Sequence, residues 1–145
     1  MKFARTAAAA LAALLALAVA AVAHDEHGGQ SGQPAPEGAR ISIAVKRDRM
    51  SGWNLFVRTR RFEFAPEHAS GRHRAGEGHA HLLIDGKKVT RLYGPAFFIP
   101  ELKPGRRQIA VALSTNDHRP YLDAQGRPLE DSVVVRVPRK RQAGH

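Results

Sequence analysis

A chain of 145 residues with no cysteine and a formal net charge of +10 is long enough for one folded domain. The lack of cysteine excludes disulfides, a lipid-anchored N-terminal cysteine, and cysteine-based zinc or redox sites. The 23 basic residues are scattered along the chain, apart from a short run at 139–141. They predict a solvated basic surface rather than a specific nucleic-acid site.

The first 23 residues have the three regions of a secretory signal peptide. Lys2 and Arg5 give it a positive start, an unbroken run of Ala, Leu and Val fills 7–20, and small residues precede a cleavage point after Ala23. The apolar run is short for a membrane span. We therefore expect a periplasmic or secreted protein of 122 residues, with a net charge of +8 and no membrane span after cleavage.

Cleavage after Ala23 would expose a metal chelator at the new N-terminus. The mature chain would begin at His24, whose free α-amine and imidazole together form a bidentate ligand for copper or nickel. The sequence from His24 to residue 39, HDEHGGQSGQPAPEGA, is rich in Gly, Gln and Pro and shows no apolar periodicity. It predicts a flexible tether at 24–39.

The segment 40–138 predicts an all-β domain. Short stretches alternate apolar and polar residues, turn residues separate them, and no segment after the signal shows helical periodicity. A phase slip across 58–61 indicates a bulge or bend within one long strand. The expected strands lie at 41–45, 53–64, 79–85, 89–93, 97–100, 109–113 and 133–137. Seven strands at this spacing favour an immunoglobulin-like β-sandwich, followed by a basic tail at 139–145.

Six potential ligand or aromatic residues are expected at one end of this sandwich. Strand direction alternates at each turn, so the loops at 65–78 and 114–128 fall at the same end as the start of the 79–85 strand. The residues gathered there are His68, His73, His79, His81, Tyr93 and His118.

Three of these histidines form the predicted metal site. His79 and His81 are two residues apart on one strand, so their side chains share a face. The third and sixth strands of an immunoglobulin-like sandwich are neighbours, which brings His118 within reach of the pair. Three imidazoles suit copper, with zinc as the other possible ion. We expect His79, His81 and His118 to bind it, with His24 as a further ligand and Asp117 orienting an imidazole. The alternative is that His79 and His81 are ordinary surface histidines.

Three motifs carry a resemblance to known proteins. Residues 78–86 read GHAHLLIDG, 102–105 read LKPG and 116–118 read NDH. This pattern resembles a family of small exported bacterial β-sandwich domains of unknown function, which implies a sandwich and export but no chemistry. A looser likeness is to periplasmic copper-resistance proteins of the CopC type. They are immunoglobulin-like sandwiches whose mature N-terminal histidine binds copper(II), which implies copper for His24.

Binding is favoured over catalysis. The sequence has no nucleophile elbow, no paired carboxylates for sugar cleavage, and no phosphate or dinucleotide loop. We therefore expect a metal-binding protein for storage, delivery or tolerance of copper. The alternative is a metal-free interaction module whose basic face binds another envelope protein or an anionic polymer. The net charge and four aromatic residues favour that alternative: Trp53, Tyr93, Phe97 and Phe98.

Overall fold

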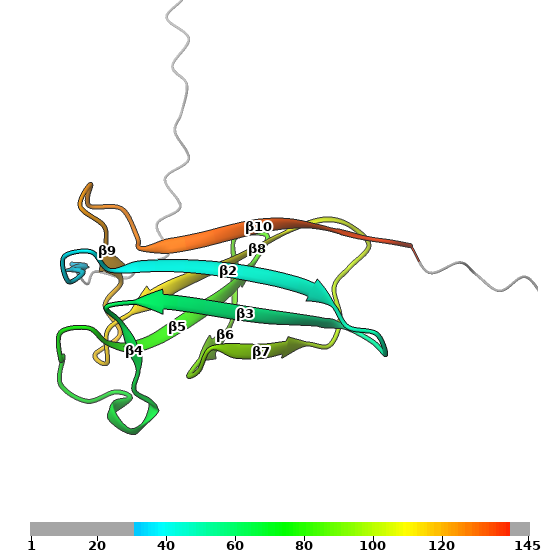
Figure 1. Cartoon of the computed structure of the whole chain (residues 1–145). Helices are drawn as coiled ribbons and strands as arrows, with labels where there is room; N and C mark the ends of the chain where they lie inside the picture. The colour runs from blue at the N-terminus through cyan, green and yellow to red at the C-terminus, as the bar shows by residue number, and fades with distance from the viewer. Residues whose placement is uncertain (1–30, 140–145) are drawn as a thin grey trace, which may run out of the picture.

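Alternating apolar and polar residues build two sheets that pack face to face, which confirms the predicted all-β sandwich (Figure 1). The computed structural model describes residues 31–139. The predicted signal peptide, the first part of the predicted tether (24–30) and residues 140–145 of the predicted tail lie outside the described residues. Within the described part of the chain, no helix is long and apolar enough to cross a membrane.

Seven longer strands form the two layers. The smaller sheet has the order β2 (Arg40–Arg47), β3 (Trp53–Arg60) and β7 (Ala96–Ile99). The larger sheet contains, in order, β10 (Glu130–Val137), β8 (Gly105–Ser114), β5 (Glu77–Ile84) and β6 (Lys87–Leu92). Among these seven strands the third and sixth, β5 and β8, are antiparallel neighbours, as expected for an immunoglobulin-like sandwich. The fourth strand, β6, pairs with β5 in the larger sheet.

The chain crosses from the smaller sheet to the larger one at Arg61. β3 ends at Arg60, and Arg61 has a left-handed backbone with φ of 53°. The two-residue strand β4 (Glu63–Phe64) then pairs in parallel with the start of β5. The phase slip in the sequence marks this crossing. It places Phe62 in the core, where its ring contacts that of Phe64 edge-on at 5.4 Å between centroids.

The structure differs from the predicted flexible tether, 24–39, over the part that is described. There β1 (Gln33–Pro34) pairs in parallel with β9 (Tyr121–Leu122), and Ala35 packs against the core. A Gly- and Pro-rich composition is typical of linkers. It carries no sign of pairing with a strand so distant in the sequence, and this is why the tether prediction is wrong from residue 31 onward.

One apolar core lies between the sheets. Its buried side chains come from both layers and from the loops that close the ends: Leu55, Val57, Phe62, Ala80, Leu82, Leu92, Ile99, Leu102, Ile109, Val111, Leu113 and Tyr121. The edge strands of the two sheets are also joined, because Asp131 Oδ2 of β10 accepts a hydrogen bond of 2.8 Å from the Ile43 amide of β2. The sandwich therefore provides a rigid base for the loops at its ends.

Candidate functional site

Strand β5 positions two of the predicted histidines. Ala80 and Leu82 face the core and are fully buried, so His79 and His81 lie on the outer face of the larger sheet. The preceding residue, Gly78, allows β5 to approach β8 closely. A Cβ at this position would lie 1.8 Å from the Ser114 carbonyl oxygen, a distance that no side chain tolerates. Glycine is therefore required for the pairing that places His79 beside Ser114.

A tight turn positions His118. Its amide donates to the Thr115 carbonyl at 3.0 Å, and the Arg119 amide donates to Thr115 Oγ1 at 2.9 Å. His118 itself has φ of 67°, a left-handed conformation that costs a non-glycine residue on the order of 1 kcal/mol. Such strain persists where the surrounding structure determines it, and it collects at functional sites. The turn thus sets where the side chain of His118 leaves the backbone.

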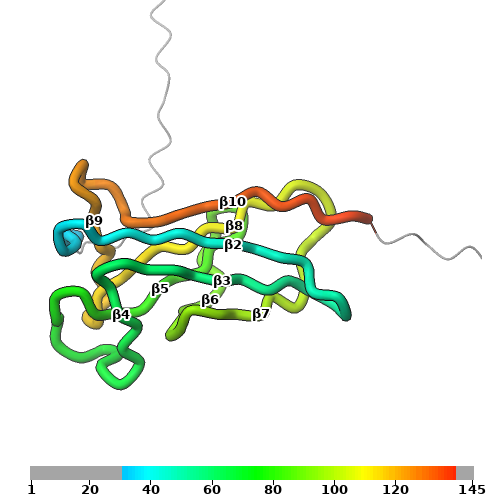
Figure 2. Tube along the Cα trace, in the orientation of Figure 1, coloured from blue at the N-terminus to red at the C-terminus, as the bar shows by residue number. Residues whose placement is uncertain are grey.

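The three predicted histidine rings lie together. The ring centroid of His79 is 4.9 Å from that of His81 and 5.0 Å from that of His118. His79 lies between the other two and is 1% exposed. Tyr93 adds an aromatic ring at 5.9 Å from His79. The three histidines thus lie side by side at one end of the sandwich, and their role as metal ligands stays a prediction. Figure 2 shows the loop after β4 and the loop after β8 meeting at this end of the sandwich.

Each of the two outer rings has one nitrogen held by a serine hydroxyl. His81 Nδ1 is hydrogen-bonded to Ser114 Oγ at 3.1 Å, and His118 Nε2 to Ser70 Oγ at 3.0 Å. His118 Nδ1 and both ring nitrogens of His79 are buried and have no hydrogen-bond partner among the described residues. In metal sites the second nitrogen of a ligating histidine is generally fixed by such a hydrogen bond. The pattern leaves one nitrogen on each outer ring available for a ligand.

His79 and His81 are neutral at neutral pH. Burial, with smaller contributions from the nearby His118, Arg91 and Lys88, lowers the pKa of His79 to about 4. Burial and the same basic neighbours lower the pKa of His81 to about 3. A neutral imidazole is the form that binds a metal ion.

In the structure, the ring nitrogens of the three histidines do not converge on one point. Across residues 31–139, no group of three or more His, Asp or Glu side chains has the geometry of a metal site. Coordination by His79, His81 and His118 would therefore require the rings to turn. The predicted fourth ligand, His24, lies outside the described residues.

Two further histidines lie at the same end but outside the cluster. His68 Nδ1 donates to Glu77 Oε2 at 2.7 Å, and this hydrogen bond is the main reason why the pKa of Glu77 is lowered. The ring of His73 is 6.1 Å from that of Tyr121. His68 is thus held by a carboxylate, and sequence reasoning missed this pair because the two residues are joined across an irregular loop.

The prediction that Asp117 orients an imidazole is wrong. Its carboxylate accepts hydrogen bonds from Thr115 Oγ1 and from Arg119 Nε, the latter at 3.1 Å. Both partners belong to the same tight turn. Asp117 therefore stabilises the turn that carries His118 and does not contact the ring.

Comparison of the chain with protein-family models, curated proteins and solved structures finds no match. The resemblance to exported β-sandwich domains and to CopC-type proteins stays a prediction from the motifs.

The aromatic residues that favoured an interaction module divide into two groups. Trp53 and Phe97 pack against the core. Tyr93 and Phe98 are 41% and 47% exposed, and Phe56, which the sequence did not single out, is 43% exposed.

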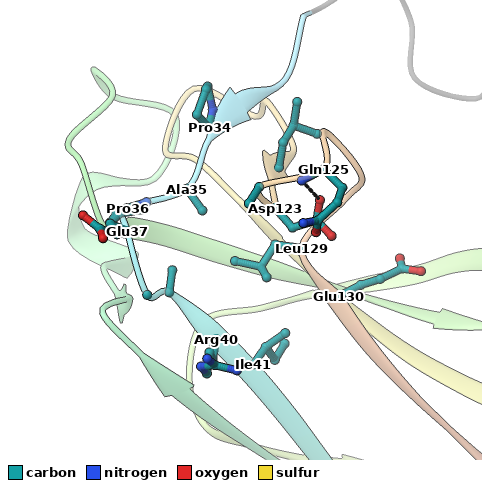
Figure 3. A pocket seen from close by; sticks show the side chains of 14 residues that line it. Pro34, Ala35, Pro36, Glu37, Arg40, Ile41, Asp123, Gln125, Leu129 and Glu130 are labelled. Carbon is teal, nitrogen blue, oxygen red and sulfur yellow. Dashed lines mark hydrogen bonds between the residues drawn. The ribbon is translucent and has the colours of Figure 1, made fainter.

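The hollow shown in Figure 3 lies away from the histidines. It has a volume of about 550 Å³, and its walls come from segments 34–41, 122–125 and 129–130. Leu129 and Ile41 form part of its apolar lining, and no histidine lines it. The hollow lies where the segment 34–41 packs against the loop at 122–125.

Proposed function

We propose that this protein is a periplasmic metal-binding protein, with copper as the favoured ion, that serves in metal storage, delivery or tolerance. The observation that carries the proposal is the group of three imidazoles with ring centroids 4.9 and 5.0 Å apart, centred on a buried histidine without hydrogen-bond partners. A buried, unsatisfied polar ring costs on the order of 1–3 kcal/mol, and a ligand that binds it removes this cost.

The donor set favours copper(II) over other divalent ions. Imidazole suits copper, zinc and nickel, and for a given nitrogen site copper(II) binds most tightly in the first-row series. Serine hydroxyls hold the second nitrogen of His81 and of His118, so these rings offer His81 Nε2 and His118 Nδ1. His79 offers either of its nitrogens. Three protein ligands leave a coordination position open, which suits an ion that is taken up and released.

Two features outside the described residues complete the proposal. The signal-peptide pattern at 1–23 supports export to the periplasm. Cleavage after Ala23 would create a second chelating group at His24, able to capture an ion and pass it to the histidine cluster.

Thermal unfolding with and without metal tests the proposal. A ligand bound only to the folded state at a hundredfold excess over its Kd adds about 2.7 kcal/mol, which raises the melting temperature of a domain of this size by several degrees. Copper(II) should produce this shift in the wild type and in a variant lacking residues 24–30. His81→Ala should abolish it. His68→Gln is the matched control and should keep it, because His68 is bonded to Glu77 outside the cluster.

The alternative function is an interaction module, and one observation favours it. Phe56 and Phe98 lie on the same outer face of the smaller sheet, since Phe56 pairs with Ala96 and Phe98 with Asn54. Lys46 on the neighbouring strand is also exposed there. If removal of residues 24–30 abolishes all metal binding and His81→Ala leaves it unchanged, the proposed site is wrong and the interaction module becomes the better account.

A further inference from the structure

Strand β6 places two basic residues beside the histidines. In the register of the larger sheet Arg91 lies opposite His81, and Lys88 lies opposite Leu83, the next residue on the same face as His81. Both basic residues are exposed. The guanidinium of Arg91 donates to the Tyr93 hydroxyl at 3.5 Å, and the ring of Tyr93 is 5.9 Å from that of His79. Arg91 and Tyr93 therefore form one flank of the histidine cluster.

These positive charges are not balanced by acidic side chains. Over the region that the structure describes, neither Arg91 nor Lys88 takes part in an ion pair. Three carboxylates pair with other residues: Glu77 with His68, Asp117 with Arg119 and Asp85 with Arg107. The flank of the cluster is left with uncompensated positive charge.

Such a flank is unfavourable for a bare metal ion. A divalent ion bound by three neutral imidazoles keeps both of its charges, and Arg91 and Lys88 each add one more nearby. Like charges this close to the ion oppose its binding. An anion bound beside the ion would offset this repulsion.

We propose that the histidine cluster binds its metal ion together with a planar oxyanion, a carboxylate or carbonate, held by Arg91. This inference rests on the proposed function. One oxygen of the anion would occupy the coordination position that three histidines leave open. Another would accept hydrogen bonds from the guanidinium, whose planar fork matches a carboxylate or carbonate and is weaker on rounder anions. Lys88 adds charge without fixed geometry.

The test is the copper(II) affinity of the protein lacking residues 24–30, measured by competition with a chromophoric chelator in a non-coordinating buffer. The titration is repeated with acetate and with bicarbonate. Coupling between two bound ligands is typically 5- to 150-fold, so we expect at least one anion to tighten copper binding by about tenfold. The copper absorption band should shift with the same anion.

Arg91→Gln should lose the anion effect and bind copper alone at least as tightly as the wild type, because a repelling charge is removed. A merely structural role for Arg91 would instead weaken binding under all conditions. Arg106→Gln is the matched control: Arg106 is exposed at the far end of β8 and should keep the full effect.

The outcomes separate the two proposals. Absence of copper binding to the deletion variant would overturn the proposed function, and this inference with it. Copper binding that neither anion changes, or an anion effect that survives in Arg91→Gln, would overturn the inference alone. An effect confined to bicarbonate identifies carbonate as the ligand, and an effect confined to acetate identifies a carboxylate-bearing molecule.

Discussion

The two ends of the β5–β8 pair differ in how far their polar side chains are hydrogen-bonded. At the end distant from the histidines, Asp85 accepts hydrogen bonds from the Gln108 amide at 2.9 Å and from Arg107 at 2.8 Å. Arg107 also donates to the Pro104 carbonyl at 2.9 Å. At the histidine end, His79 is buried with neither nitrogen bonded to a described residue.

This difference separates a region built for stability from one that gives up stability. Polar groups in a protein interior are almost always paired, because an unpaired one costs the full price of its desolvation. Sites that depart from this rule tend to serve function. Both ends hold a residue with a left-handed backbone, Asp85 and His118. At the Asp85 end one buried side-chain nitrogen, Arg107 Nε, has no partner among the described residues, whereas at the histidine end three ring nitrogens of His79 and His118 have none.

The largest expected effect comes from Gly78→Ala. The added Cβ would collide with the Ser114 carbonyl, so the β5–β8 pair must separate at the histidine end, at a cost of about 3 kcal/mol or more. Gly86→Ala is the control in the turn at the other end. Its φ is 79°, but nothing lies within 4 Å of the new Cβ, so backbone strain alone should cost about 1 kcal/mol. Urea unfolding of both variants measures how much free energy of unfolding each one loses. Equal losses would contradict the close approach seen at Gly78.

Acid should weaken the metal-free protein chiefly through the histidine end. The pKa of His79 falls from 6.5 in the unfolded chain to about 4 in the fold, so between these values the unfolded state binds more protons. Its contribution to stability is complete above pH 6.5 and is lost as the pH falls toward 4, amounting to about 2–3 kcal/mol by pH 4.5. His81, with its pKa also lowered, acts in the same direction.

Denaturant unfolding at a series of pH values checks this prediction. His79→Leu should reduce the slope between pH 6.5 and 4.5 without abolishing it, because His81 still contributes in that window. The lowered pKa of Asp85 acts in a lower range, below the ordinary value of 3.8, and should contribute little in that window. A profile that is flat in the wild type would show that these rings are more solvated than the structure indicates.

Loss of the carboxylate should weaken the opposite end. Asp85→Ala removes acceptors for the Gln108 amide and for Arg107, and we expect the free energy of unfolding to fall. Asp85→Asn should lose less, because it keeps an acceptor and tolerates the left-handed φ of 50°. If Asp85→Ala is neutral, this end is not stabilised by its hydrogen bonds and the contrast between the two ends disappears.

Replacement of the central histidine should have a smaller effect of the opposite sign. His79→Leu exchanges an unpaired polar ring for an apolar side chain of similar size, and should raise the stability of the metal-free protein by about 1 kcal/mol while abolishing metal binding. His68→Leu is the matched comparison and should destabilise, because Glu77 would lose its partner. Calorimetry distinguishes the two. Destabilisation by His79→Leu would mean that the ring has favourable contacts that outweigh its unpaired nitrogens.

The sequence predicted those features that depend on short-range periodicity. Alternation along β5 was enough to place His79 and His81 on one face, and the strand count was enough to make β5 and β8 neighbours. Together these two inferences located His118 beside the pair.

Features that depend on single long-range contacts escaped prediction. The pairing of β1 with β9 joins short segments without alternation, and the bond between His68 and Glu77 spans an irregular loop. Asp117 was assigned to an imidazole from its position next to His118, but the turn geometry directs it to Thr115 and Arg119. Hydrogen-bond partners of loop residues are set by backbone conformation, which a residue pattern does not specify.

Electron paramagnetic resonance of one equivalent of copper(II), added to the protein lacking residues 24–30, tests the central claim most directly. The account predicts nitrogen hyperfine splitting from imidazole ligands. The spectrum should change in both His81→Ala and His118→Ala and stay unchanged in His68→Gln. An identical spectrum in the wild type and all three variants, or a spectrum of copper with oxygen ligands only, would contradict a copper site at the histidine end of the sandwich.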